Sequence, residues 1–98
     1  MNVQFHEAAR TEFDDAVLYY AAISPTLSAE FLAEAERAVG KVVERPNAWQ
    51  PFGKHMRRYI FNRFPFGLVY RLEEGKIKVY AVMHLKRRPG YWHNRLGS

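Results

Sequence analysis

A histidine, a group of cations and two large aromatics lie close together near the end of the 98-residue chain. His84 is followed by three consecutive cations, residues 86–88, and after a Pro-Gly break by Tyr91 and Trp92. Histidine is suited to proton transfer near neutral pH, cations to binding anionic groups, and aromatic rings to stacking on bases. We therefore expect this stretch to contact a polyanion or an acidic groove on a protein. The alternative for His84 is a structural hydrogen bond to the backbone at a strand end.

The other candidate residues exclude several kinds of site. The chain has no cysteine, and its four histidines, His6, His55, His84 and His93, form neither an H-x-x-x-H nor an H-E-x-x-H pair. Without such ligand spacings we expect no metal site. A glycine-rich phosphate loop and a G-x-S-x-G motif are also absent from the sequence, so no cofactor is expected.

The two halves of the chain carry opposite charge. Residues 1–50 hold four Lys/Arg against eight Asp/Glu, a net charge of −4, whereas residues 51–98 hold eleven against two, a net charge of +9. This asymmetry favours an anionic partner for the C-terminal half. The alternative is that the arginines form a solvated face or pair with acidic helices, and that Tyr91 and Trp92 fold back on the sheet edge. With no signal-peptide pattern and no long apolar run, we expect a cytoplasmic protein without membrane contact.

The N-terminal half predicts a short strand and two helices. Residues 3–5 alternate like an edge strand, and from residue 7 apolar side chains recur at helical spacing up to residue 23. Ser24 followed by Pro25 then ends one helix and caps the next, because serine accepts from free N–H groups and proline suits the first helical position. The second helix is predicted to stop at Arg45, before Pro46. A loop this short predicts an antiparallel helical hairpin.

The C-terminal half predicts three strands, over residues 56–61, 66–72 and 76–84, joined by short loops and therefore antiparallel. We expect one α+β domain over residues 1–98, with the hairpin on one face of the sheet and the other face open. Alternation divides the last strand into two sets, Ile77, Val79, Ala81 and Met83 on one face and Lys78, Tyr80, Val82 and His84 on the other.

Three placements of single residues follow from this arrangement. His84 is expected on the open face, away from the helices. Because Arg57 and Arg58 alternate along the first of the three strands, only one of them can share the face of His84. Trp49 and Phe52 are predicted to be exposed in the loop before that strand.

The chain resembles the RelE/ParE superfamily of type II toxin–antitoxin toxins, also called plasmid-stabilisation proteins. The resemblance rests on element order, on the pair Tyr19-Tyr20, and on residues 64–70, which are similar to the F-P-[FY]-x-[IVL]-x-Y strand of that family. Residues 84–92 are similar to its H-x-x-R-x-P-x-x-W close. The resemblance implies a β-α-α-β-β-β fold and neutralisation by a small cognate antitoxin.

The resemblance implies one of two targets. RelE-like members are endoribonucleases that cut mRNA on the ribosome, which would make His84 the base, Arg58 and Arg88 charge stabilisers, and Tyr91 or Trp92 a stacking platform. ParE-like members inhibit DNA gyrase and cleave nothing themselves. Their target would be bound by the C-terminal cations and aromatics, Arg87, Arg88, Tyr91 and Trp92. The H-x-x-R close favours the ParE branch, and a non-toxic relative that only binds antitoxin is the third possibility.

Overall fold

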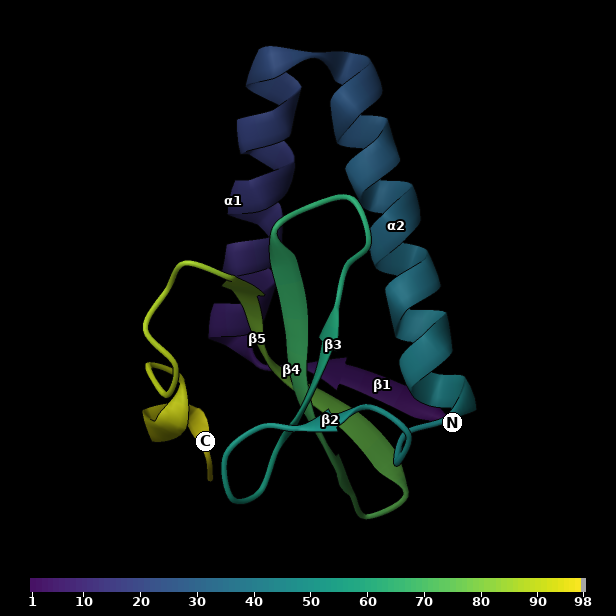
Figure 1. Ribbon diagram of the computed structural model, residues 1–98, viewed down its shortest axis with the longest axis vertical. Coiled ribbons are helices and arrows are strands. Elements are labelled where there is room, and N and C mark those ends of the chain that lie inside the picture. Colours follow the sequence, from purple (N-terminus) through teal and green to yellow (C-terminus); the bar gives the residue numbers. More distant parts are fainter. Residues whose placement is uncertain (98) are drawn as a thin grey trace.

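The computed structural model describes residues 1–97 and, apart from one short strand and a 3₁₀ turn, has the element order that the sequence predicts (Figure 1). Strand β1 (Asn2–Phe5) leads into helices α1 (Glu7–Ile23) and α2 (Pro25–Glu44), which form a hairpin. The strands β2 (Gln50–Pro51), β3 (Arg57–Ile60), β4 (Phe66–Glu73) and β5 (Lys76–His84) follow, and a 3₁₀ turn, η1 (His93–Arg95), lies near the C-terminus. The two-residue strand β2 and the turn η1 are not predicted by the sequence.

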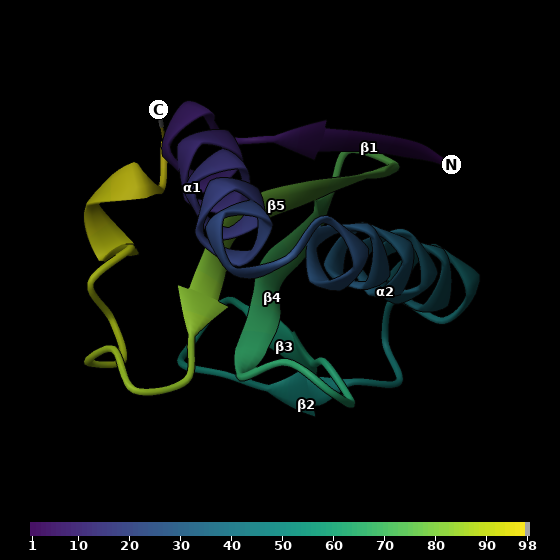
Figure 2. The same cartoon turned by 90° about the horizontal axis from the view of Figure 1, so that it is seen from above.

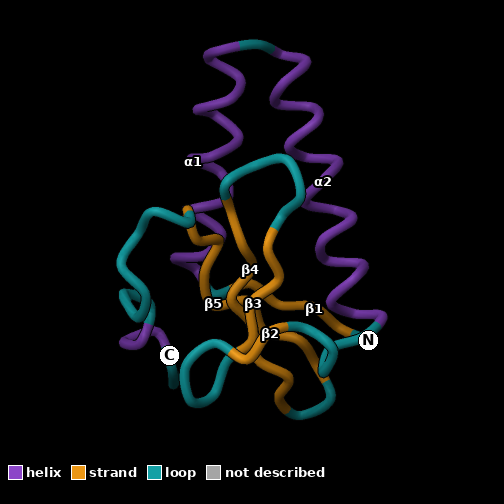
Figure 3. The backbone as a smooth tube through the Cα atoms, in the orientation of Figure 1, coloured by secondary structure: helices purple, strands orange, loops and turns teal. Residues whose placement is uncertain are grey.

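The strands form one five-stranded sheet in the order β1-β5-β4-β3-β2, drawn in orange in Figure 3. β1 pairs with β5 in parallel, and the other neighbours pair antiparallel. The predicted α+β fold with a mainly antiparallel sheet is confirmed. The parallel pair arises because β1 and β5 are separated by the rest of the fold rather than by a hairpin turn.

Both helices begin at a side-chain cap. The Ser24 hydroxyl accepts from the Leu27 N–H at 3.4 Å and Pro25 takes the first helical position, as the sequence predicts. α1 is capped by an unusual residue, since Nδ1 of His6 accepts from the Ala8 N–H at 3.0 Å. His6 therefore has a structural role at the point where β1 passes into α1.

The main core lies between the helices and one face of the sheet (Figure 2). Phe31 of α2 is fully buried and contacts the rings of Tyr20, Phe64 and Phe66 at centroid distances of 5.2, 5.2 and 5.4 Å. The aromatic stripes of the two helices are thus core residues, as the helical spacing indicates. Glu34, buried to 4% exposure, accepts from the backbone N–H groups of Asn62 and Arg63 and thereby ties α2 to the β3–β4 loop.

The opposite face of the sheet is not open, and the prediction on this point is wrong. A second core of buried residues lies there, formed by Met56, Val69, Tyr80, Ala81, Met83 and Trp92, with Phe52, Tyr91 and Leu96 packed against it. Trp92 is 1% exposed. The chain end therefore folds back over the sheet face and buries the apolar side chains that a wet face would leave in water.

A β-bulge in β5 overturns the predicted division of that strand. Tyr70 pairs with Val79 and Val69 with Ala81, so Tyr80 is an extra residue in the ladder. One extra residue reverses the alternation that follows it. Val82 consequently belongs to the helix-side core and Ala81 to the opposite core, the reverse of the prediction.

The loop before β3 is less exposed than predicted. Trp49 lies edge-on against Tyr59 at 4.7 Å between ring centroids, and its Nε1 donates to the Lys41 carbonyl at 3.1 Å. Phe52 is half-buried against Trp92, at 5.7 Å between centroids. Both aromatics therefore pack against the sheet near β2 instead of lying exposed.

Candidate functional site

The segment that follows β5, residues 85–97, is called here the C-terminal segment. It leaves the strand through a turn in which the Leu85 N–H donates to the Pro65 carbonyl at 2.9 Å and the Arg87 N–H to the His84 carbonyl at 3.0 Å. The next bend requires a glycine: Gly90 has φ +91°, and a Cβ there would lie 2.9 Å from Cδ2 of His93. The segment then curves past the outer side of β5 toward the start of α1 (Figure 2).

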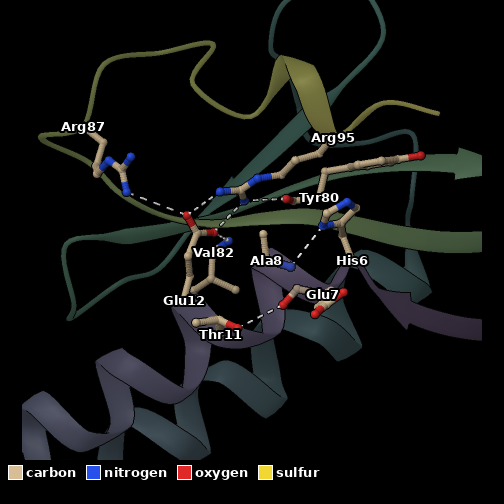
Figure 4. Close-up of polar contacts among 9 residues, drawn as sticks. All are labelled: His6, Glu7, Ala8, Thr11, Glu12, Tyr80, Val82, Arg87 and Arg95. Atoms are coloured by element: carbon tan, nitrogen blue, oxygen red, sulfur yellow. Dashed lines mark hydrogen bonds and ion pairs between the residues drawn. The ribbon is translucent and has the colours of Figure 1, made fainter. Parts of the chain in front are cut away.

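A carboxylate from α1 holds this segment (Figure 4). Nη1 and Nη2 of Arg95 donate to the two oxygens of Glu12 at 2.9 and 3.0 Å, a two-pronged ion pair. The side chains of Arg95 and Glu12 are only 14% and 16% exposed, so solvent screens the pair weakly. Arg87 approaches the same carboxylate at 3.8 Å and is itself half-exposed.

The pair also completes the edge of the sheet. β1 accompanies β5 only as far as Val79, whose carbonyl accepts from the His6 N–H at 2.8 Å. Beyond that point the Val82 N–H donates to Glu12 at 3.0 Å, and the Tyr80 carbonyl accepts from Arg95 at 2.8 Å. Glu12 and Arg95 thus satisfy backbone groups that β1 is too short to reach.

Tyr91 lies between the two arginines of this cluster. The guanidinium carbons of Arg87 and Arg95 lie 3.8 and 5.1 Å from the centre of its ring, both within the range of cation–π attraction. Burial, followed by the neighbouring Glu12 carboxylate, raises the pKa of Tyr91 well above its usual value. The environment of Tyr91 therefore favours the protonated phenol.

His84 lies on the helix side of the sheet, so its predicted position on the open face is wrong. It lines a cleft of about 660 Å³ between α1 and the ends of β4 and β5, together with Glu12, Tyr19, Ile23, Phe66 and other residues. Its ring meets the Phe66 ring edge-on at 5.1 Å, and its Nδ1 accepts from the Lys86 N–H at 3.1 Å. The backbone hydrogen bond at a strand end, considered above as the alternative for this histidine, is present.

Arg58 lies on the opposite face. Its guanidinium stacks over the ring of Phe52, 4.1 Å from the centroid, and donates to the Gln50 side chain at 3.2 Å. Arg57 instead donates to the Trp49 carbonyl at 2.8 Å. Since Phe52 packs against the second core and His84 against the first, the sheet separates Arg58 from His84.

Comparison with known proteins assigns the family. Residues 3–89 match the model of the family described as "ParE toxin of type II toxin-antitoxin system, parDE". The chain belongs to this family. The solved structure titled "Chromosomal ParDE TA system from P. aeruginosa" has a chain with the same fold, at a TM-score of 0.76 and 18% identity over 88% of this chain and 97% of that one. No curated protein sequence gives a significant match.

The fold brings only part of the predicted ParE-type binding residues together at the surface. Arg87 and Tyr91 are in contact, and Arg88 is exposed next to them. Trp92 is buried in the second core and is not available to a partner in this structure. Glu12 and Arg95 are missed by sequence reasoning, because a carboxylate in the middle of a helix and an arginine near the chain end have no local pattern that links them.

Residues 1–97 contain neither a metal-ligand cluster nor a membrane-spanning helix. No cluster of three or more histidine and carboxylate side chains that could hold a metal ion occurs in this part of the chain. Neither helix is long and apolar enough to cross a membrane. The candidate site comprises the cations and aromatics of the C-terminal segment, with Glu12 of α1 as their carboxylate partner.

Proposed function

We propose that this ParE-family protein inhibits DNA gyrase by binding it through the C-terminal segment, and that a cognate antitoxin neutralises it by direct binding. The observation that carries the choice of target is the position of His84. The endoribonuclease alternative needs a base, charge stabilisers and a stacking ring around one phosphate. Here His84 and Arg58 lie on opposite faces of the sheet, and Trp92 is buried. His84 shares its cleft with Arg87 and Tyr91, but Arg58 and Trp92 do not reach that cleft, so the set that the endoribonuclease alternative names is incomplete there.

A binding role requires only that these residues present a surface that a partner can contact. Arginine and tyrosine are frequent anchors of protein interfaces. Arg87 is half-exposed, and it stacks on a tyrosine ring that Arg95 also contacts. The positive charge of this pair and of the exposed Arg88 next to it suits an acidic partner surface. Because the pair is rigid, little conformational freedom is lost on binding.

The antitoxin is proposed to cover apolar surface on the helical hairpin. A groove of about 390 Å³ runs between the helices and the sheet, lined by Phe5, Phe13, Leu32, Ala35, Val39, Leu68 and two charged residues, Arg10 and Glu36. At the far end of α1, Leu18, Tyr19 and Ile23 are each at least 60% exposed. Apolar surface of this extent is typical of a partner site. Slower hydrogen exchange over residues 13–35 on adding antitoxin is expected, and unchanged exchange there would contradict this part of the proposal.

Purified components test the target. We expect the protein to inhibit DNA supercoiling by gyrase and the antitoxin to relieve the inhibition. Arg88→Ala should weaken inhibition by roughly tenfold or more, as loss of an interface arginine commonly does. Arg37→Ala, an equally exposed arginine on α2, is the matched control and should inhibit like the parent. Full gyrase activity at saturating protein would contradict the proposal.

A further inference from the structure

We propose that Glu12 is a positioning residue, which holds the C-terminal segment and its Arg87–Tyr91 pair in the arrangement that binds the target. The inference deepens the proposed function and rests on it, because it concerns the same binding surface. Glu12 itself lies on α1, far from that surface in the sequence. Its role is to place other residues rather than to touch the partner.

One carboxylate makes contacts with three distant parts of the chain (Figure 4). It accepts from the Val82 N–H at the end of β5 and from both terminal nitrogens of Arg95, and it pairs with Arg87 at 3.8 Å. The two arginines that flank the Tyr91 ring therefore share one anion. Two like charges held this close need a common counter-charge, which Glu12 supplies.

The attachment extends to the second core. The Arg95 N–H donates to the Trp92 carbonyl at 3.0 Å, so the position of Arg95 is coupled to that of the buried indole. Without Glu12, Arg95 loses the carboxylate to which both its terminal nitrogens donate, and a largely buried guanidinium is driven toward water. We expect the C-terminal segment to open as a local unit while the helices and sheet stay folded.

Asp15 provides a matched control. It lines the same cleft from the next turn of α1 and is exposed, but its carboxylate makes none of the side-chain hydrogen bonds or ion pairs found in residues 1–97. Replacing Asp15 by asparagine removes the same charge from the same helix. Any effect that depends on charge alone should therefore appear in both variants, and an effect of position only in the Glu12 variant.

Hydrogen exchange of the full-length protein measures the opening. In Glu12→Ala we expect exchange over residues 85–97 and at the Val82 amide to rise roughly 10- to 100-fold, the usual effect of losing a charge-assisted hydrogen bond on a local equilibrium. Glu12→Gln should fall between Glu12→Ala and the parent, because its amide oxygen still accepts from Val82. In a Trp49→Phe background, Trp92 emission should shift to the red in Glu12→Ala. Asp15→Asn should match the parent in each measurement.

Growth inhibition in bacteria supplies the functional half of the test. Toxicity should follow the exchange order, with Asp15→Asn equal to the parent, Glu12→Gln reduced and Glu12→Ala lowest. Unchanged exchange in Glu12→Ala, faster exchange spread over the whole chain, or full toxicity with an open C-terminal segment would each overturn the inference. If the parent fails to inhibit gyrase, the proposed target is wrong, while the exchange and growth results still decide the role of Glu12.

Discussion

The two faces of the sheet are closed in different ways. The helix-covered face is filled by a cluster of aromatic rings around Phe31, and the buried carboxylate of Glu34 ties α2 to the β3–β4 loop. The opposite face is covered by the chain end, with Trp92 as its largest buried side chain and the Glu12–Arg95 pair as its attachment to α1. Each face thus depends on one helix carboxylate that reaches across to a distant segment.

The difference lies in what each carboxylate secures. Glu34 secures a loop that is also anchored by strands on both sides, so its contacts belong to the cooperative unit of the fold. Glu12 secures a segment anchored by a strand on one side only. A segment attached at one end opens locally at lower cost than the whole domain. The second face is therefore where a substitution is expected to change binding without unfolding the protein.

Glu34→Ala should give the largest loss of stability. It removes a buried carboxylate and leaves the partly buried N–H groups of Asn62 and Arg63 without their charged acceptor, and a loss of about 2–4 kcal/mol in the free energy of unfolding is expected. Urea denaturation followed by circular dichroism measures it. The exposed pair between Glu30 and Arg63 offers a nearby control, since Glu30→Ala should cost well under about 1 kcal/mol. Similar losses for both variants would contradict the importance given to burial.

The Glu12–Arg95 pair should show strong coupling in a double-mutant cycle. Because the pair is two-pronged and mostly buried, we expect a coupling energy of about 1–2 kcal/mol between Glu12→Ala and Arg95→Ala. The exposed pair of Arg10 and Asp14 on α1 is the comparison, with an expected coupling of about 0.3–0.5 kcal/mol. Additive effects at Glu12 and Arg95 would mean that the ion pair does not hold the segment.

Substitutions of the adjacent residues Arg57 and Arg58 allow a direct comparison of the two faces, because the two side chains lie on opposite sides of the sheet. Arg57→Ala removes a hydrogen bond to the Trp49 carbonyl and should lower stability by about 1 kcal/mol with little effect on toxicity. Arg58→Ala removes the stack on Phe52, which contacts Trp92, and should lower toxicity in a protein that still folds. Denaturation and growth assays measure the two effects, and equal behaviour of both variants would refute this division.

The smallest expected effect concerns pH at the start of α1. Burial, followed by the positive charges of Arg95 and Lys78, lowers the pKa of His6 below 6.5, its usual value. The unfolded chain then binds the proton more readily, so this contribution to stability is complete above pH 6.5 and falls as the pH drops toward the folded-state value. His6→Asn keeps an acceptor for the cap but does not titrate. Melting temperatures between pH 5 and 8 should vary less in that variant, and identical profiles would contradict the assignment.

The sequence predicts much of the fold because its signals are local. The helix limits follow from Ser24, Pro25 and Pro46, and the strand limits from runs of β-branched and aromatic residues between glycine and proline. The face of His84 is not predictable in the same way, since a single bulged residue, Tyr80, reverses the alternation of the residues that follow it. Nothing local in the sequence marks that bulge.

The covering of the second face by the C-terminal segment is not predictable from the sequence for a related reason. Covering it requires that residues 85–97 fold back over the sheet, which depends on an ion pair between residues 83 positions apart. Composition does indicate that Tyr91 and Trp92 can fold back on the sheet, but not that Glu12 holds the segment in place. Long-range polar contacts of this kind are specified by the assembled fold and leave no periodic pattern.

The replacement of His84 by glutamine distinguishes a gyrase inhibitor from an endoribonuclease. Both proteins are expressed in bacteria, growth is followed, and cellular mRNA is mapped by primer extension. A gyrase inhibitor needs no proton transfer from this residue, so we predict that His84→Gln stays toxic and that neither protein cuts mRNA. Removing a general base lowers a cleavage rate by roughly 10²–10⁴-fold. In-frame cuts by the parent that disappear in His84→Gln would show instead that the protein is an endoribonuclease with His84 as its base.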